Sequence, residues 1–444
     1  MRRPLLFLAL VAASAVAHAQ ELRPELTRLA IVGAKIETAP GVILENGTIL
    51  INSGVITAVG TGLTIPPGSD VIDGKGLFVY AGFVDCGVSK GLKDIAPLPR
   101  QAEAFDPSAD FMTSMPLNNV AVAPDLMAID WYDPDDAAWN GERAAGFTSV
   151  WLLPKGGILK GQAAFVNIDG RARRFSAILD RAGLVCGFEG GGNPYPGTAL
   201  GAFATARQAF MDTEWNRRSV EAYAAGKGPR PAHDPALDAL EQYRATALPL
   251  VLDANEAWRI DSALNFASEW KRRPIVFGAS QGYLATPLPK NTEIIAKLDF
   301  GPEPVAGADD PPAKVAERQR LWKLKVKNAQ TLLERGGELS FTTTGCRDAA
   351  QFFENLRRIV KEGFPRTAAL AALTTQPAHM LGLDTKFGTI AVGKTANLTL
   401  MTADFLDPNA KLKLLVIDGN KIDPAKQPFR FDNAVPSFRD GGRR

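Results

Sequence analysis

The sequence predicts an α/β protein in which β segments from the two ends of the chain bracket a middle made of repeated βα units. Short apolar alternations broken by turn residues run from Leu29 to Val79 and return near the C-terminus, at 396–401 and 414–422. Between them, from about Gly82 to Leu383, short apolar runs alternate with longer segments of helical spacing. Alternation with a period of two is typical of antiparallel strands, whereas repeated βα units form a parallel sheet or a barrel.

The expected strands and helices follow one another in a simple order. In the N-terminal segment the predicted strands are 30–36, 47–52 and 55–59, with 52–54 as a hairpin turn. In the middle the predicted strands are 148–153, 248–252 and 274–277, and the predicted helices are 260–270 and 348–361. A polar stretch rich in proline and aspartate, 97–136, interrupts the first unit, and we expect it to cover one face as a lid or a partner surface.

The first twenty residues have the pattern of a secretory signal peptide. Arg2 and Arg3 precede an apolar run from Leu5 to Val11, and small residues end at 17–19. The apolar run is far shorter than the roughly 20 residues that a membrane-spanning helix needs. We therefore expect residues 1–19 to be removed before Gln20 and the protein to be exported, to the periplasm if the cell is Gram-negative.

The composition excludes several classes of protein. Of the 444 residues, 46% are hydrophobic and 22% are charged, which excludes a disordered chain and a coiled coil. The 50 Lys and Arg residues against 48 Asp and Glu give a formal charge of +2, so there is no basic footprint for a nucleic acid. Three cysteines exclude a disulfide scaffold but permit one disulfide in an oxidising compartment.

Four segments carry a pattern that several enzymes share. They are 76–85, which reads Gly-Leu-Phe-Val-Tyr-Ala-Gly-Phe-Val-Asp, and 142–150, 374–383 and 388–398. This pattern resembles the amidohydrolase superfamily, in its imidazolonepropionase and dihydroorotase-like branch. The resemblance implies a (β/α)8 TIM-like barrel at 81–385 and a small β-sandwich composed of 20–80 and 386–444. It also implies hydrolysis of C–N bonds by one or two divalent metal ions at the carboxyl ends of the barrel strands.

The metal ligands that this resemblance implies are missing from the sequence. Gly87 and Ser89 stand where relatives have a His-x-His pair, and no lysine between 160 and 227 could supply a carbamylated bridge. The strand ends expected to carry two further histidines read Asp-Ala-Asn at 253–255 and Gly-Ala-Ser-Gln at 278–281, and threonines replace the aspartate of the last strand. Glycine and hydroxyl groups are poor zinc ligands. The sequence therefore predicts no metal, no cofactor and no catalytic residue.

The two histidines that follow the signal peptide do not replace these ligands. His233 lies in a loop that enters a helix, and His379 lies in a predicted outer helix; neither has the paired spacing of a metal site. We expect both to be ordinary surface histidines. An oxygen-only site for magnesium or calcium, made by Asp85, Asp253 and Asp348, is an alternative. Each aspartate also has a structural explanation: Asp85 could brace the first strand, Asp253 could anchor its loop and Asp348 could cap a helix.

The cysteines suggest a second feature of the implied barrel. Cys86 follows its first strand and Cys346 its last, and these strands are neighbours when a barrel closes. The pair could form a disulfide across the mouth, provided that the Cα atoms lie within about 7 Å. Buried free thiols are the alternative, and catalysis by cysteine is disfavoured because no histidine is adjacent in sequence.

The function predicted from these observations is that of an exported pseudoenzyme, which binds a small polar ligand or serves as partner to an intact amidohydrolase paralogue. The residues expected to line its pocket are Ser89, Asn255, Ser280, Gln281 and Thr344, with Asp85 at the mouth. An active hydrolase that cleaves C–N bonds of cyclic amides through a non-standard site is the alternative. A purely structural interaction module is a third reading. No motif specifies the ligand or the oligomeric state.

Overall fold

The computed structural model describes residues 28–93, 121–188, 196–307 and 310–423. The predicted signal peptide and its cleavage site lie outside these residues, as do 97–120 of the predicted polar insertion and the end of the chain from 424. No described helix is both long and apolar enough to cross a membrane.

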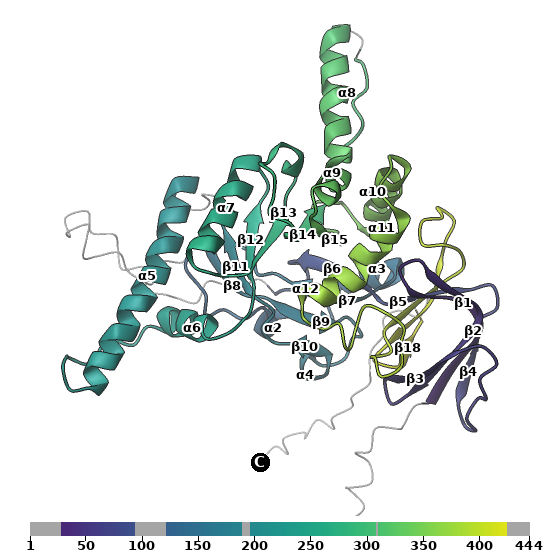
Figure 1. Cartoon of the computed structure of the whole chain (residues 1–444). Helices are drawn as coiled ribbons and strands as arrows, with labels where there is room; N and C mark the ends of the chain where they lie inside the picture. Colours follow the sequence, from purple (N-terminus) through teal and green to yellow (C-terminus); the bar gives the residue numbers. More distant parts are fainter. Residues whose placement is uncertain (1–27, 94–120, 189–195, 308–309, 424–444) are drawn as a thin grey trace, which may run out of the picture.

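Strands from both ends of the chain form one eight-stranded sheet, which lies at one end of the molecule (Figure 1). Its order is β18-β17-β16-β5-β1-β2-β3, with β4 paired to β1. The strands are β1 (Arg28–Ala39), β2 (Val42–Asn52), β3 (Val55–Gly60), β4 (Asp70–Asp73), β5 (Phe78–Ala81), β16 (Leu398–Met401), β17 (Leu412–Ile417) and β18 (Asn420–Ile422). The two chain ends meet where β5 pairs with β16 in an antiparallel register.

Alternating apolar residues from several strands of this sheet form one core. Ile31, Ile49, Val79, Leu398 and Val416 belong to one buried cluster, although they come from five different strands. The period-two pattern therefore places one face of each strand inward, and the sheet curls around that core. The strands from the two chain ends do come together, as predicted. They form one hydrogen-bonded sheet rather than two separate sheets that face each other.

The middle of the chain forms two further sheets. One has the order β10-β9-β7-β6 and the other β15-β14-β13-β12-β11-β8. Their strands are β6 (Phe83–Val88), β7 (Phe147–Leu152), β8 (Leu159–Gln162), β9 (Ala164–Asn167), β10 (Ala177–Leu179), β11 (Leu184–Gly187), β12 (Leu250–Ala254), β13 (Pro274–Gly278), β14 (Glu293–Lys297) and β15 (Glu338–Thr342). β6 pairs with β7, and β11 to β15 pair in order, all parallel.

The predicted (β/α)8 TIM-like barrel is not shown as one continuous sheet by this topology. β9 is antiparallel to β7 and β8 is antiparallel to β11, so the chain passes from one sheet to the other through Ala163 between them. Within the described residues the first strand, β6, is not joined to β15 by a strand ladder. Side chains make that junction instead. The Asp85 carboxylate accepts hydrogen bonds from Thr343 N (2.8 Å) and Thr343 Oγ1 (2.6 Å), and Thr344 Oγ1 donates to Gly87 O (2.9 Å).

The space between these strands is filled by apolar side chains. Val84, Trp151, Val251, Phe277 and Ile295, from five different strands, belong to one buried cluster. Such a filled interior is typical of TIM-like barrels, in which the strand ends rather than the interior carry function.

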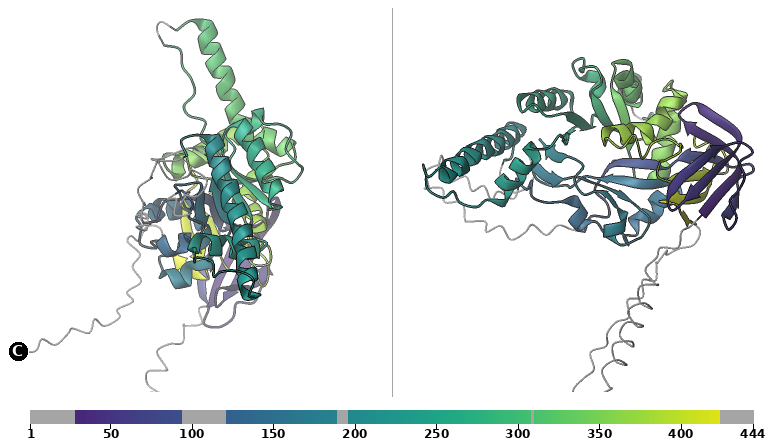
Figure 2. Two further views of the ribbon diagram at one scale, coloured as in Figure 1. Left: turned by 90° about the vertical axis from the view of Figure 1, so that its left-hand side faces the viewer. Right: turned by 60° about the horizontal axis from the view of Figure 1, so that its bottom comes forward.

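Helices cover the outside of these sheets (Figures 1 and 2). They are α2 (Ala128–Trp131), α3 (Ala138–Ala145), α4 (Arg173–Ser176), α5 (Ala199–Ala224), α6 (Pro235–Arg244), α7 (Ala257–Glu269), α8 (Pro312–Val326), α9 (Asn328–Glu334), α10 (Ala349–Lys361), α11 (Arg366–Leu373) and α12 (Thr375–Met380). α5 and α6 lie at the end opposite the eight-stranded sheet, and α8 projects away from the body.

Several helices begin at a residue suited to cap them. Asp348 Oδ1 accepts the backbone N–H of Gln351 (2.8 Å) at the start of α10, and Asp234 Oδ1 caps α6 in the same way, with Pro235 as the first helical residue. Such caps satisfy backbone donors that have no partner inside the helix. Asp348 therefore has the helix-capping role that was weighed against metal binding.

Candidate functional site

The carboxyl ends of β12, β13 and β14 bring several predicted pocket residues together. Ser280 Oγ donates to Asn255 Oδ1 (3.1 Å), and the backbone N–H of Gln281 donates to the carbonyl of Asn255 (2.8 Å). The same Asn255 oxygen lies 3.4 Å from Lys297 Nζ, at the end of β14. These four residues form a polar group, here called the rim cluster. Three of them were predicted from the sequence, and Lys297 was not.

Lys297 is the cation of the rim cluster. Its ammonium lies 4.9 Å from the centroid of the Phe277 ring, on the neighbouring strand. Among the residues that the structure describes, no carboxylate lies within ion-pair distance of Lys297 Nζ. A partly buried ammonium that is held by an amide oxygen and an aromatic face retains the capacity to bind an anion.

A second lysine at the same strand ends pairs with an aspartate. Lys160 Nζ on β8 donates to Asp253 Oδ2 at 2.7 Å, and the two side chains are 14% and 15% exposed. Lys160 crosses the end of β11, where a Cβ on Gly187 would lie 2.5 Å from Lys160 Cε. The glycine therefore provides the space through which the lysine reaches Asp253. The Lys160 ammonium therefore neutralises the Asp253 carboxylate, which would otherwise be free to bind a metal ion.

The end of β6, where relatives have a His-x-His pair, is covered in this chain by an aromatic ring. Gly87 has a φ of +78°, and a Cβ there would lie 2.4 Å from Phe277 Cε2. Ser89 Oγ donates to the carbonyl of Leu153 (2.7 Å). The backbone conformation and the ring leave no room for a side chain at position 87, and the Ser89 hydroxyl proton is used within the protein.

The other predicted pocket residues lie apart from the rim cluster. Thr344 bonds to Gly87, as described above, at the junction of β6 and β15. Asp85 is 1% exposed and accepts two hydrogen bonds from Thr343. It was predicted to lie at the mouth of the pocket, and the structure corrects this because a buried carboxylate joining two strands is out of reach of a ligand.

These positions also test whether the strand ends fit a divalent metal ion. The three aspartates considered for an oxygen-only site are dispersed, since Asp85 is buried at β6, Asp253 pairs with Lys160 and Asp348 caps α10. Two lysine ammonium groups lie where ligands would be needed. Ammonium groups repel a metal ion and donate no electron pair, so the described residues at these strand ends do not fit a catalytic metal.

A buried pair of acids lies beside this junction. Glu142, on α3, is 2% exposed, and its Oε2 is buried with no hydrogen-bond partner among the described residues. Lys90 Nζ forms an ion pair with Glu142 Oε1, donates to Thr343 Oγ1 (2.8 Å) and lies 3.8 Å from Asp85 Oδ2. Burial, together with the charge of Asp85, raises the pKa of Glu142 to about 8. Burial likewise raises the pKa of Asp85, although Lys90 and the Thr343 donors oppose that shift, so the pair of acids holds a proton at neutral pH.

The cysteines do not form the disulfide between Cys86 and Cys346 that the sequence left open as a possibility. All three are free thiols, and Cys86 lies in the apolar cluster between the sheets. The Cys346 sulfur lies beyond the end of β15, 3.9 Å from Asn355 Nδ2 of α10. The two thiols therefore have different surroundings. Burial raises the pKa of the Cys86 and Cys186 thiols and raises that of Cys346 to about 11.

These thiols are expected to react slowly in the native protein. With a pKa of about 11, Cys346 is a thiolate in about one molecule in a thousand at pH 8. We expect its reaction with Ellman's reagent to be at least about 100-fold slower than that of a free cysteine, and those of Cys86 and Cys186 slower still. In guanidinium chloride without reductant, three thiols per chain should react. One thiol per chain would instead show that a disulfide forms.

Comparison with known proteins supports the fold. Residues 315–422 match the amidohydrolase family. The solved structure of an amidohydrolase from Thermotoga maritima MSB8 is similar, with a TM-score of 0.71, 20% identity, and coverage of 89% of this chain and 99% of that chain. A putative prolidase from Bifidobacterium longum has a TM-score of 0.56 at 16% identity, covering 91% and 97% of the two chains. A molinate hydrolase has a TM-score of 0.51 at 17% identity, covering 95% and 100%.

The predicted superfamily is supported by these matches at the level of fold and of the C-terminal segment. They do not distinguish one branch of the superfamily from another, so the imidazolonepropionase and dihydroorotase-like branch stays a prediction.

Proposed function

We propose that this chain, which has the fold of the amidohydrolase superfamily, is an exported, non-catalytic protein that binds a small polar ligand through the rim cluster. The ligand carries an anionic group that pairs with Lys297. The single observation that carries the proposal is that two lysines, Lys160 and Lys297, lie at the strand ends where a hydrolase of this fold would hold its metal. An intact amidohydrolase paralogue remains the proposed partner.

The chemistry of these strand ends favours binding over hydrolysis. Metal-dependent hydrolysis of a C–N bond needs a cation that polarises the carbonyl group and lowers the pKa of a bound water. A lysine ammonium can stabilise negative charge, but it offers no open coordination position for that water. Asp253 is not a free general base either, because its carboxylate accepts the Lys160 hydrogen bond at 2.7 Å.

The rim cluster is suited to recognise a carboxylate with a neighbouring polar group. Lys297 supplies the charge, and the Asn255 amide and the Ser280 hydroxyl, 3.1 Å apart, lie beside it as neutral polar groups. Such a combination of one charge with a few fixed polar groups is typical of small-molecule sites. Dipeptides that end in proline are suitable probes, because a putative prolidase is among the structures with this fold.

The test combines turnover with binding. With added zinc or manganese, we expect no hydrolysis of an Ala-Pro dipeptide or of a panel of cyclic amides. Calorimetric titration with a panel of carboxylate ligands, Ala-Pro among them, should identify a binder whose affinity falls about 10-fold or more in Lys297→Met. Arg320→Met removes a cation from an exposed helix face and is the matched control.

Two outcomes would overturn this proposal. Turnover that depends on added metal and is lost with a chelator would establish the alternative, an active hydrolase with a non-standard site. Binding that is equal in Lys297→Met and in the unaltered chain would remove the rim cluster as the site.

A further inference from the structure

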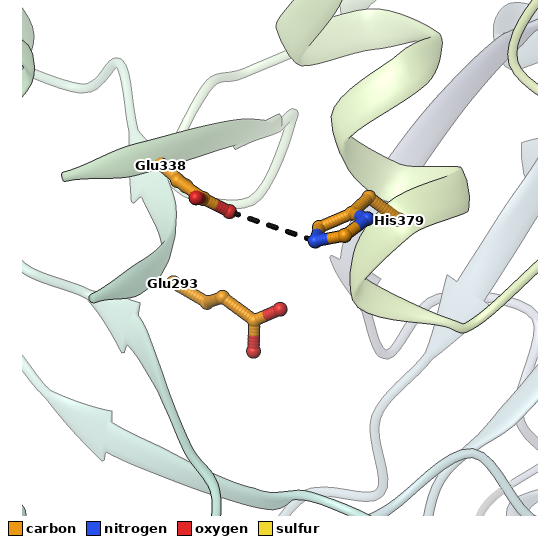
Figure 3. Close-up of side chains that lie close together, drawn as sticks. All are labelled: Glu293, Glu338 and His379. Carbon is orange, nitrogen blue, oxygen red and sulfur yellow. Dashed lines mark ion pairs between the residues drawn. The ribbon is translucent and has the colours of Figure 1, made fainter. Parts of the chain in front are cut away.

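A histidine and two glutamates meet at the opposite ends of the strands from the rim cluster. Glu293 and Glu338 are the first residues of β14 and β15, and they are directly paired in the parallel register. His379, on α12, faces them (Figure 3). One ligand atom from each residue lies within 4.8 Å of the others. Among the described residues, this is the one such group of three metal-ligating side chains.

The charges around these residues leave one carboxylate without a strong partner. Arg273 Nη1 contacts both carboxylate oxygens of Glu293 at 2.7 Å and so neutralises it. Burial raises the pKa of Glu293, and the like charge of the neighbouring Glu338 adds to that shift, against the effect of Arg273. Within the described part of the chain, His379 is the one basic group at ion-pair distance from Glu338, with Nε2 and Oε2 4.0 Å apart.

The histidine is oriented as a metal ligand would be. Its Nδ1 lies 3.3 Å from Asp384 Oδ2, so a proton on Nδ1 is held by that carboxylate. The lone pair of Nε2 then faces the two glutamates. A carboxylate that orients the far nitrogen of an imidazole is the usual arrangement behind a metal-binding histidine.

The distances suit an ion better than a hydrogen bond. A separation of 4.0 Å between Nε2 and Oε2 is too long for a hydrogen bond. Two ligand atoms that are each about 2.1 Å from a shared zinc ion lie about 3.4 Å apart in a tetrahedral site. The side chains of His379 and Glu338 are 57% and 27% exposed. They can therefore move from 4.0 Å apart to the spacing that a shared zinc ion requires, and the ion can reach them from solvent.

We propose that Glu338 and His379 bind a zinc ion that fastens α12 to the start of β15, beside Glu293, whose carboxylate is held by Arg273. The site is independent of the rim cluster, and its role is structural. Imidazole and carboxylate are both common zinc ligands, and water completes the coordination. Arg273 keeps its hydrogen bond from Nη2 to the carbonyl of Met380 (2.8 Å), which already holds the end of α12 near β13.

The experiment is a calorimetric titration of the tag-free, chelator-treated chain with zinc chloride. We expect one zinc ion per chain and a rise in melting temperature with zinc. His379→Ala should weaken binding at least about 10-fold, and Asp384→Asn, which alters only the orienting carboxylate, should weaken it by a similar factor. His233→Ala is the matched control, because that histidine is 78% exposed and pairs with Asp238 on another helix.

Three results would overturn the zinc site. They are no binding up to millimolar zinc, equal affinity in His379→Ala and the unaltered chain, or equal loss in His233→Ala. Circular dichroism of each variant excludes misfolding as a cause. Lys297→Met should bind zinc normally, so failure of this site and failure of the proposed rim cluster can be told apart.

Discussion

The stability of the protein is expected to fall steeply between pH 5 and pH 8 because of one buried carboxyl group. Burial, together with the charge of Asp85, raises the pKa of Glu142 to about 8 in the native state, against 4.5 for an ordinary glutamate. Between these values the native state holds a proton that the unfolded state has released, so the free energy of unfolding decreases as pH rises. The slope for one such proton is about 1.4 kcal/mol per pH unit. Most of the stability that the bound proton contributes should be present at pH 5 and lost above pH 8.

The variant Glu142→Gln tests whether Glu142 is the cause of this pH dependence. Glutamine keeps the shape of the protonated acid and can donate to Asp85, but it does not titrate. Urea denaturation at pH 5, 6, 7 and 8 should show a shallower decline for Glu142→Gln, and at pH 8 the variant should be more stable than the unaltered chain by about 2 kcal/mol. Glu241→Gln, on the exposed face of α6, is the matched control. A profile of equal slope in Glu142→Gln would contradict a buried protonated Glu142.

Substitution of Gly87 is expected to be the most destabilising change at the strand ends. A side chain at a φ of +78° is strained by about 1 to 2 kcal/mol, and overlap with the Phe277 ring adds about 1 to 3 kcal/mol. Gly87→His should therefore lower the free energy of unfolding by about 3 kcal/mol or more. The double change Gly87→His with Ser89→His restores the sequence motif, yet it should not create a metal site, because the ring and the lysines still occupy the space.

Gly76 provides the control for Gly87. It has a φ of +74°, but a Cβ there meets no atom within 4 Å. Gly76→Ala therefore measures the backbone strain alone, and Gly87→Ala measures strain plus overlap. Equal losses in the two variants, measured by urea denaturation, would contradict the close contact with Phe277. In a background of Phe277→Ala, the extra loss of Gly87→Ala should disappear.

Much of the fold could be predicted from the sequence because it depends on local periodicity. The period-two alternation of β1 to β3 and the apolar runs of β12 and β13 were recognised in this way. The antiparallel arrangement of β8, β9 and β10 was not, since very short strands carry too few residues to show their direction. The missing closure between β6 and β15 likewise depends on contacts between residues far apart in sequence.

The candidate site was predicted only in part, for a related reason. Asn255, Ser280 and Gln281 follow strands and could be placed at the strand ends by the fold alone. Lys160 and Lys297 belong to no motif, and their importance appears only when Gly187 and Phe277 are seen beside them. His379 was interpreted as an ordinary surface histidine because Glu293 and Glu338 lie on other elements, distant along the chain.

The central claim is that Lys160 and Lys297 take the place of a metal ion at the carboxyl ends of the strands. The most direct measurement is an anomalous difference map from crystals of the protein soaked in zinc. We predict no zinc peak at Asp253, with Lys160 still hydrogen-bonded to that carboxylate. A zinc ion bound to Asp253, with Lys160 displaced, would contradict the account.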